Sequence, residues 1–257
     1  MKIRQNIHPA HVSALSALVG DIASGGVPAQ AVEIYQGRNV VAAFDGPEGY
    51  RLNIKAFRRP NAINRFAYGV LRHGKARRAY DNALRLLEAG LSTPQPLAWI
   101  ECRTCAGALL SESYFLSEQL DGREDIRRCA GMADFDTIAR GIAAVMLRLH
   151  RAGIWMKDFT PGNILWRRLP DGTYDFALVD INRMAFGVRS HRRLMSNFGR
   201  LFPNDDAATE RVARHYASLA GLDAWHVAED ARRAIADARR RLQRKNILKK
   251  LFKHKRK

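Results

Sequence analysis

The chain has 257 residues, of which 47% are hydrophobic and 26% charged, and its formal net charge is +18. These proportions are typical of a globular protein with one large domain or two lobes, and they exclude disorder over most of the length. No run approaches the roughly 18 apolar residues of a membrane span, and the N-terminal stretch has no signal-peptide core, so we expect a cytoplasmic protein. The three cysteines form an odd, sparse set that fits reduced thiols better than disulfides.

The first half of the chain is expected to be rich in strands. After a helix near residues 9–23, the runs "AVEIY", "NVVAAF" and "YRLNIKAF" predict three strands within residues 31–57. The turns "QGRN" and "DGPEG" join them into an antiparallel meander. The stretch "KARRAYDNALRLLEAG" predicts a helix whose apolar face holds Ala76, Tyr80, Ala83, Leu84 and Leu87. "PLAWIE" and "SYFLSEQL" then predict two more strands around a loop, which makes five strands in all.

The second half is expected to be mainly helical. "DFDTIARGIAAVMLRLHRAG" has helical spacing, and "NILW" and "YDFALVDI" predict two short strands around the turn "RRLPDG". Residues 190–245 predict further helices with arginine-rich faces. The pattern indicates an α+β protein with an N-terminal lobe at 1–120, a C-terminal lobe at 121–238 and a basic tail at 239–257.

The stretch "GIWMKDFTPGNILW", residues 153–166, places Asp158 and Asn163 five residues apart in a loop that Pro161 stiffens. Asp180 ends the apolar run "FALVD" soon afterwards. Taken singly, these residues are ordinary: an aspartate in a turn, a capping asparagine and a strand-end aspartate. Together they supply a base and hard oxygen ligands of the kind that Mg²⁺ and nucleotide phosphates need, so their joint occurrence favours phosphoryl transfer.

"LHRAGIWMKDFTPGNILW" resembles the catalytic loop of the protein-kinase-like superfamily. "KDFTPGNILW" and "FALVDINRMAFG" together are more similar to the bacterial lipopolysaccharide core kinases, which act on Kdo or heptose. The resemblance extends through "YRLNIKAFRRPNAINRFAYG", the helix that follows and "SYFLSEQL", and covers roughly residues 31–220. It implies a two-lobed fold, with a five-stranded sheet and a helix in the first lobe, and an ATP-dependent, Mg²⁺-dependent enzyme.

The resemblance also implies roles for individual residues. Asp158 would accept the proton of the acceptor hydroxyl, and Asn163 and Asp180 would hold Mg²⁺. Lys55 would contact the α- and β-phosphates of ATP, although a lysine in a strand can also reach solvent. Asp81 would be the helical partner of Lys55. Its neighbours at i−4 and i+4 are arginines, so a surface ion pair is the alternative for Asp81, and Glu88 is an alternative partner for Lys55.

Two further nucleotide contacts follow from position. Gly37 in "YQGRN" stands where protein kinases have a loop with three glycines, but a tight hairpin without a ligand is an equal alternative. Glu118, Gln119 and Leu120 stand where the lobes join, and their backbone groups would meet the adenine.

The sequence departs from the general kinase pattern at two motifs. Met156-Lys157-Asp158 replaces His-Arg-Asp, which argues against activation by phosphorylation of a loop. Asp180-Ile181-Asn182 replaces Asp-Phe-Gly and lacks the glycine that eases backbone rearrangement, so the site is expected to be permanently formed. No recognisable A-P-E segment follows.

Cys102 and Cys105 form one close pair. With no second pair and no nearby histidine, the two thiols cannot complete a four-ligand zinc site, so we expect them to be free.

The tail carries 11 Lys or Arg in 19 residues and no acid. Ile247, Leu248, Leu251 and Phe252 fall on one helical face, which favours an amphipathic helix at an anionic membrane surface over a nucleic-acid arm. A disordered solubilising tail is the alternative.

The sequence therefore predicts an ATP-dependent kinase that phosphorylates a sugar hydroxyl of lipopolysaccharide core at the cytoplasmic face of the inner membrane. Its acceptor would be an anionic glycolipid. A serine/threonine protein kinase of the same fold is the first alternative, and a non-enzymatic adaptor driven by the positive charge is the second.

Overall fold

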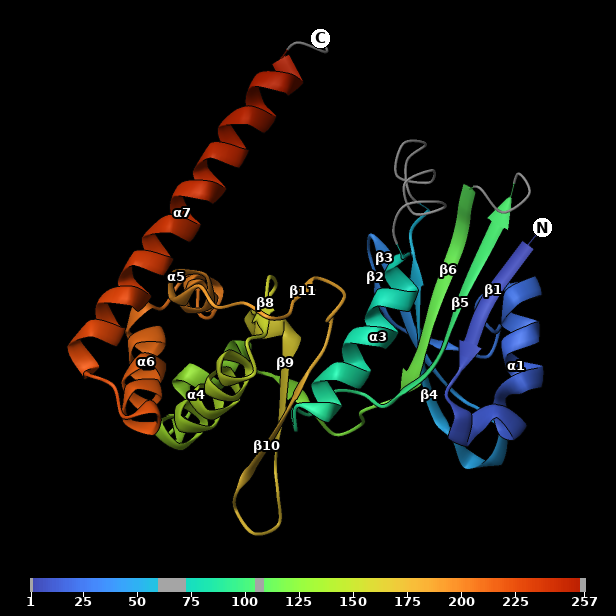
Figure 1. Ribbon diagram of the computed structural model, residues 1–257, viewed down its shortest axis with the longest axis horizontal. Helices are drawn as coiled ribbons and strands as arrows, with labels where there is room; N and C mark the ends of the chain where they lie inside the picture. The colour runs from blue at the N-terminus through green and yellow to red at the C-terminus, as the bar shows by residue number, and fades with distance from the viewer. Residues whose placement is uncertain (1, 60–72, 105–108, 255–257) are drawn as a thin grey trace. The chain divides into compact units, whose positions relative to one another are not determined.

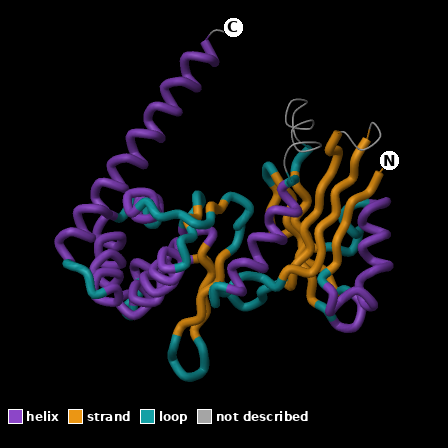
Figure 2. The backbone as a smooth tube through the Cα atoms, in the orientation of Figure 1, coloured by secondary structure: helices purple, strands orange, loops and turns teal. Residues whose placement is uncertain are grey.

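The computed structural model describes residues 2–59, 73–104 and 109–254, with side chains up to Leu248. The chain divides into two compact units, Met1–Asp121 (unit 1) and Gly122–Lys257 (unit 2). Strands dominate unit 1 and helices dominate unit 2 (Figure 2). Cys105 and the end of the stretch "YRLNIKAFRRPNAINRFAYG" lie outside the described residues.

Unit 1 is built on a six-stranded antiparallel sheet with the strand order β1-β5-β6-β4-β3-β2 (Figure 1). The strands are β1 (Lys2–Ile7), β2 (Val32–Gln36), β3 (Asn39–Asp45), β4 (Arg51–Phe57), β5 (Pro96–Thr104) and β6 (Leu109–Glu118). The predicted meander is confirmed as β2-β3-β4. The 3-10 turn η2 (Pro47–Gly49) lies between β3 and β4.

The predicted strand count of five is wrong by one, because β1 pairs with the edge of β5 and adds a sixth strand. Only Ile3 and Ile7 are apolar in β1, and five of its six residues are exposed. A polar edge strand has no alternating pattern to reveal it. β5 also continues to Thr104, and β6 begins at Leu109, so both strands extend into the stretch expected to be a loop.

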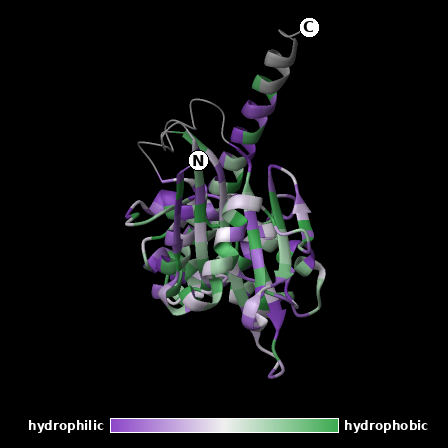
Figure 3. Ribbon diagram, turned by 90° about the vertical axis from the view of Figure 1, so that its right-hand side faces the viewer, coloured by the Kyte–Doolittle hydropathy of each residue, from purple (hydrophilic) through white to green (hydrophobic). Residues whose placement is uncertain are grey.

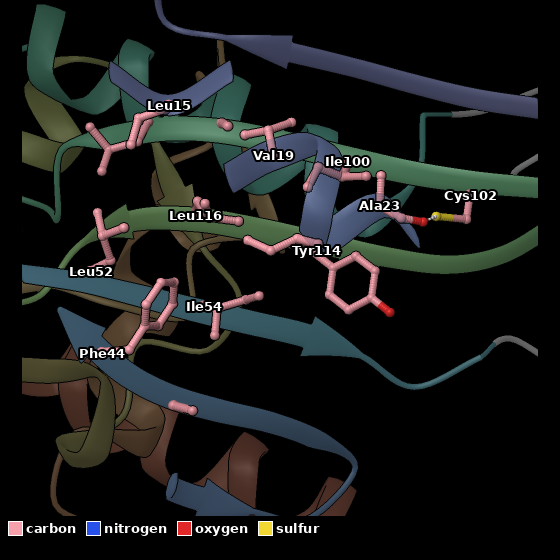
Figure 4. Packing of buried hydrophobic residues seen from close by; sticks show 14 residues of the cluster. Leu15, Val19, Ala23, Phe44, Leu52, Ile54, Ile100, Cys102, Tyr114 and Leu116 are labelled. Carbon is pink, nitrogen blue, oxygen red and sulfur yellow. Dashed lines mark hydrogen bonds between the residues drawn. The ribbon is translucent and has the colours of Figure 1, made fainter. Parts of the chain in front are cut away.

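Helix α1 (Val12–Gly25) follows the 3-10 turn η1 (Pro9–His11) and packs on one face of the sheet. Its buried residues Leu15, Val19 and Ile22 recur at helical spacing and contact a cluster from the sheet that includes Phe44 and Leu116 (Figure 4). Burial of such side chains stabilises the fold by about 1.5–3 kcal/mol each. Unit 1 therefore has an apolar core of its own between α1 and the sheet.

Helix α3 (Lys75–Glu88) lies on the opposite face of the sheet (Figure 1). The predicted apolar face is confirmed at Ala76, Tyr80 and Ala83, but Leu84 and Leu87 are only partly buried. Ala79 and Leu86 take their place on the buried face, and both are at most 3% exposed. The sheet covers a narrower strip of the helix surface than the sequence predicts, and the two leucines lie at the edge of that strip.

Three helices form most of unit 2: α4 (Phe135–Arg151), α6 (Asp206–Ala220) and α7 (Ala224–His254). α4 carries a buried stripe that runs from Phe135 to His150, and α6 packs against both α4 and α7. The shorter helical pieces are η5 (Ile126–Gly131), η6 (Pro161–Asn163), α5 (His191–Met195) and η7 (Ser196–Arg200). Gly221 ends α6 in the left-handed conformation, with φ of +67°.

Two small sheets shape the middle of unit 2. β9 (Ile164–Arg168) pairs with β10 (Tyr174–Leu178), as predicted, and β7 (Glu124–Asp125) adds a third strand. β8 (Trp155–Met156) pairs with β11 (Met184–Ala185). β7, β8 and β11 were not predicted, because two residues are too few to show periodicity.

The predicted tail begins inside α7, so residues 239–254 continue one helix of 31 residues. Hydrophilic and hydrophobic residues alternate along its described part (Figure 3). Leu242, Ile247 and Leu248 are 53–59% exposed. Among the described residues, no helix is long and apolar enough to cross a membrane.

Candidate active site

Asp158 lies in the segment between β8 and η6, and its side chain is only 8% exposed. Arg183 donates two hydrogen bonds to the carboxylate of Asp158, from Nε to Oδ2 and from Nη2 to Oδ1, each 2.5 Å long. Arg200 donates a third hydrogen bond, from Nη1 to Oδ1, at 3.2 Å. A buried carboxylate requires such charged partners, so the two arginines explain how Asp158 tolerates its position.

The backbone beside Asp158 is fixed by β8 and by a buried polar network. Asn197 donates from Nδ2 to the carbonyl of Met156 at 2.6 Å, and its Oδ1 lies 3.1 Å from Nε2 of His150. The Nδ1 atom of His150 lies 2.9 Å from the hydroxyl of Tyr216. Since Asn197 presents its oxygen to the ring, the network assigns the proton to Nε2 and leaves Nδ1 as the acceptor.

Burial lowers the pKa of His150 to about 4, against a smaller opposing effect of the hydrogen bond with Asn197. Burial also raises the pKa of Tyr216 to about 12. Both side chains are therefore neutral near pH 7, and the network supports the loop without adding charge. Met156 stands where most kinases have a histidine, and this network supports its backbone.

Asn163 and Asp180 lie next to Asp158 in unit 2. Asn163 donates from Nδ2 to the backbone carbonyl of Asp158 at 2.9 Å, so its amide oxygen is the end left for a ligand. The backbone carbonyl of Asn163 accepts a hydrogen bond from the amide of Val179 at 3.0 Å, which ties it to the residue before Asp180. Unit 2 thus brings together the three residues Asp158, Asn163 and Asp180.

Asp180 adopts a left-handed backbone conformation, with φ of +52°. A non-glycine residue there is strained by roughly 1–3 kcal/mol, and such strain concentrates at functional sites. Asn182 donates from Nδ2 to Oδ1 of Asp180 at 2.7 Å, and the amide of Lys157 donates to the carbonyl of Arg183 at 3.0 Å. These contacts hold the segment that follows Asp180 against the Asp158 loop, and a permanently formed site stays a prediction.

Lys55 lies within β4, paired in register with Val41 on β3 and Phe115 on β6. It is partly buried, and its Nζ lies 5.6 Å from the centre of the Phe57 ring. Lys75, at the start of α3, places its Nζ 6.0 Å from the same ring. Lys55 is therefore held on the face of the sheet that α3 covers.

Asp81 is 42% exposed, and its Oδ2 lies 3.6 Å from Nε of Arg77 and 3.7 Å from Nδ1 of His73. These contacts match the surface ion pair that was the alternative for this residue. Glu88, the other candidate partner of Lys55, is exposed at the end of α3. The pairing of Lys55 with either acid stays a prediction.

Glu118, Gln119 and Leu120 lie close to the end of unit 1. The amide of Glu118 donates to the carbonyl of Gln95 at 3.0 Å, and that of Gln119 donates to the carbonyl of Arg51 at 2.9 Å. Asn53 also donates to Oε1 of Gln119 at 2.7 Å. Of the three amides expected to meet adenine, that of Leu120 is the one without a hydrogen bond to another described residue.

Gly37 lies in the hairpin between β2 and β3 and donates from its amide to the carbonyl of Asn39 at 3.2 Å. A Cβ at this position would lie 2.4 Å from the hydroxyl oxygen of Tyr35. Tyr35 is 59% exposed, so its ring can move aside and this contact alone does not require a glycine. A role of Gly37 in cradling phosphates stays a prediction.

Cys102 is fully buried, and its thiol donates to the carbonyl of Ala23 at 3.5 Å. Burial, and to a lesser degree the charge of Glu112, raises the pKa of this thiol. Within residues 2–59, 73–104 and 109–254, no group of three or more His, Cys, Asp or Glu side chains is arranged to hold a metal ion. Mg²⁺ with a nucleotide needs only one or two carboxylates, so the pair Asn163 and Asp180 fits this ion.

The sequence did not reveal Arg183, Arg200 and Asn197 as parts of the site. Arg183 is in the quoted motif "FALVDINRMAFG", but its contact with Asp158 spans 25 residues. Arg200 and Asn197 approach the loop across about 40 residues. Long-range side-chain contacts leave no periodic signal, although an arginine three residues after Asp180 was a visible candidate.

A family model, described as the lipopolysaccharide kinase (Kdo/WaaP) family, matches residues 28–217. The chain belongs to this family. It is therefore an ATP-dependent phosphotransferase, and the recognition made on the catalytic-loop motifs is confirmed. The match spans Lys55 in unit 1 and Asp158, Asn163 and Asp180 in unit 2.

Two solved structures share the fold of this member of the lipopolysaccharide kinase family. WaaP in complex with acyl carrier protein matches with a TM-score of 0.61 and 14% identity, over 95% of this chain and 99% of that one. The Rio2 kinase-ADP/Mg²⁺-phosphoaspartate complex from Chaetomium thermophilum matches with a TM-score of 0.51 and 16% identity, over 87% of this chain and 75% of that one. At these identities the likeness establishes a protein-kinase-like fold. No curated protein sequence matches the chain.

Proposed function

We propose that this protein transfers the γ-phosphoryl group of ATP to a sugar hydroxyl of lipopolysaccharide core, on Kdo or heptose, at the cytoplasmic face of the inner membrane. The family match over residues 28–217 carries the proposal, because it includes every residue of the phosphoryl-transfer set. The two arginines that pair with Asp158 fix the orientation of its buried carboxylate, which suits a residue that positions an acceptor hydroxyl.

Asp158 is the proposed acceptor of the hydroxyl proton. The sugar oxygen attacks the γ-phosphorus, its bond to phosphorus forms as the bond to the β-phosphate oxygen breaks, and ADP leaves. The hydroxyl proton passes to the carboxylate. Phosphoryl transfer of this kind forms no covalent bond between the protein and the phosphoryl group, so Asp158 contributes mainly by orienting the hydroxyl.

Unit 1 supplies the proposed nucleotide contacts. Lys55 neutralises charge on the α- and β-phosphates, and the backbone of Glu118–Leu120 receives the adenine. Since two of the three hinge amides are used within unit 1, the amide of Leu120 is the proposed donor to the base. Gly37 would lie beside the phosphates, and Asp81 would orient Lys55.

Asn163 and Asp180 would hold Mg²⁺ through the amide oxygen and the carboxylate. When bound, the ion supplies charge neutralisation to the phosphates. The donor set fits, because both side chains offer hard oxygen ligands, and the hydrogen bond that the Asn163 amide nitrogen donates to the Asp158 carbonyl leaves its oxygen as the ligand atom. Asn182 keeps the Asp180 carboxylate oriented.

The basic helix α7 is the proposed membrane contact. From residue 239 onwards every residue with a described side chain is exposed, including Leu242, Ile247 and Leu248. Exposed apolar residues among lysines and arginines are typical of helices that lie in a membrane interface. Each cation near an anionic surface contributes about 1 kcal/mol, which would keep the enzyme at its glycolipid acceptor.

A carrier protein is a second candidate partner, because the WaaP structure is a complex with acyl carrier protein. Titration of acyl carrier protein into this protein would test it directly. Binding that is unaffected by anionic liposomes would indicate a separate protein contact, and no binding would remove this candidate.

Transfer of radiolabelled phosphate from ATP to purified lipid A-core oligosaccharide tests the proposal. A generic serine/threonine peptide serves as the second acceptor, and Asp158→Asn serves as the inactive variant. Label on the glycolipid that depends on Asp158 is the expected result. Label on the peptide alone would refute the sugar acceptor in favour of a protein kinase.

A further inference from the structure

Two guanidinium groups meet one carboxylate at Asp158, so the cluster carries a net charge of +1. The side chains of Arg183 and Arg200 are 53% and 55% exposed, whereas that of Asp158 is 8% exposed. Among the described residues, Asp158 is the only acid that pairs with either arginine. Asp158 therefore lies beside two partly exposed cationic side chains.

The hydrogen bonds leave one acceptor position on the carboxylate. An ionised carboxylate offers about four lone-pair positions, two on each oxygen. Within the part of the chain that the structure describes, Oδ1 accepts from both Arg183 and Arg200, while Oδ2 accepts only from Nε of Arg183. The remaining position on Oδ2 is available for the acceptor hydroxyl.

The two arginines differ in how much of their hydrogen-bonding capacity they use. Arg183 binds Asp158 through two parallel bonds of 2.5 Å, the geometry that fixes a carboxylate plane. Arg200 makes one hydrogen bond to the described residues, 3.2 Å long, and so uses one of its five N–H groups there. Arg183 is thus committed to Asp158, whereas most of the Arg200 fork faces solvent.

Arg200 projects from a rigid support. It is the last residue of η7, in which Asn197 anchors the carbonyl of Met156. A Cβ on Gly199 would lie 2.4 Å from the carbonyl oxygen of Ala234, so η7 packs directly on the backbone of α7. These contacts fix the backbone from which the Arg200 side chain extends to Asp158.

We infer that Arg200 binds an anionic group of the acceptor, a carboxylate or a phosphate, next to the hydroxyl that Oδ2 of Asp158 receives. Arg183 is a positioning residue that holds the Asp158 carboxylate in the orientation leaving Oδ2 open. The acceptor is therefore an acidic sugar whose charged group lies close to the hydroxyl being phosphorylated. This inference rests on the proposed function and assigns the acceptor specificity to one residue.

Calorimetric titration with three acceptors tests the assignment in the presence of ADP and Mg²⁺. The acceptors are intact lipopolysaccharide core oligosaccharide, the same oligosaccharide with its carboxylates reduced to alcohols, and the same oligosaccharide after removal of its phosphates. The proteins are wild type, Arg200→Gln and the matched control Arg192→Gln, which removes a nearby charge whose side chain is 90% exposed. Arg200→Lys keeps the charge but loses the planar fork.

Arg200→Gln is expected to weaken binding of the intact acceptor roughly ten- to a hundredfold, the usual effect of losing a charged hydrogen bond. Removing the recognised anion should weaken wild-type binding equally and cause no further loss in Arg200→Gln. If the acceptor with reduced carboxylates shows this pattern, Arg200 recognises a carboxylate. If the acceptor without phosphates shows it, Arg200 recognises a phosphate. Arg200→Lys should bind with intermediate affinity, and Arg192→Gln should bind like wild type.

Equal affinity of wild type for all three acceptors, or an equal loss of all three with Arg200→Gln, would overturn the assignment. So would a fall in kcat with unchanged acceptor affinity, because Arg200 would then act on the transferred phosphoryl group. Phosphate transfer measured in parallel separates the two claims. Transfer by wild type without coupling refutes only the role of Arg200, whereas absence of transfer to any sugar refutes the proposed function as well.

Discussion

Replacing His150 by glutamine is expected to remove a pH-dependent part of the stability of unit 2. His150 is 7% exposed, with its ring between Asn197 and Tyr216. Burial lowers its pKa to about 4 in the folded protein, whereas an exposed histidine in the unfolded chain titrates near 6.5. Glutamine keeps a polar side chain of similar length but does not titrate.

The sign and size of the effect follow from these two pKa values. Below about pH 6.5 the unfolded chain binds a proton at His150, but the folded protein does not until about pH 4. Stability is therefore lost as the pH falls through this window. Between pH 7.5 and 5.0 the loss from this residue is about 2 kcal/mol. It would reach about 3 kcal/mol below pH 4.

Urea unfolding followed by tryptophan fluorescence at pH 7.5 and 5.0 measures the effect. Other groups titrate in both proteins, so the informative quantity is the difference between the two pH-dependent losses. His150→Gln should lose about 2 kcal/mol less than wild type. His226→Gln, which changes a histidine with a 75% exposed side chain, is the control and should behave as wild type. Equal losses in wild type and His150→Gln would refute a buried, neutral histidine.

Three further changes have defined outcomes. Lys55→Met should lower kcat/KM for ATP about 100- to 1000-fold. The control Lys75→Met removes the other cation near the Phe57 ring and should leave kcat/KM nearly unchanged. Equal effects of the two substitutions would refute the role of Lys55 in binding phosphate. Arg103→Met should lower the free energy of unfolding by about 3–5 kcal/mol, because it leaves the carboxylate of Glu101, which is 1% exposed, without its buried cationic partner. A loss below about 1 kcal/mol in urea unfolding would contradict a buried ion pair. Deletion of residues 239–257 should abolish sedimentation with anionic liposomes, and unchanged sedimentation would remove the membrane role.

The sequence predicted the helices and strands that show a repeated or extended pattern of apolar residues, and those that end in distinctive turns. The meander within residues 31–57 was visible because its strands are short runs rich in strand-forming residues and its turns have characteristic residues. β1 was missed because it gains its conformation from pairing with β5 and has little pattern of its own. The same reason applies to β8 and β11, which hold the loop around Asp158 in only two residue pairs.

The residues of the site divide in the same way into those with a signal in the sequence and those without one. Asp158, Asn163 and Asp180 were found from their spacing, which is a local property of the chain. The arginines that hold Asp158 were not, because a contact across 25 or 42 residues depends on tertiary packing. The left-handed conformation of Asp180 was also invisible, since aspartate carries no obligatory signal for positive φ.

Mass spectrometry of lipid A-core oligosaccharide after incubation with ATP, Mg²⁺ and the enzyme tests the central claim most directly. Wild type should add one phosphate to a core sugar, and Asp158→Asn should lower the rate roughly 100- to 10,000-fold. Asp171→Asn, at an exposed turn aspartate, should leave the rate unchanged. An unmodified glycolipid, or one modified equally by wild type and Asp158→Asn, would contradict the account.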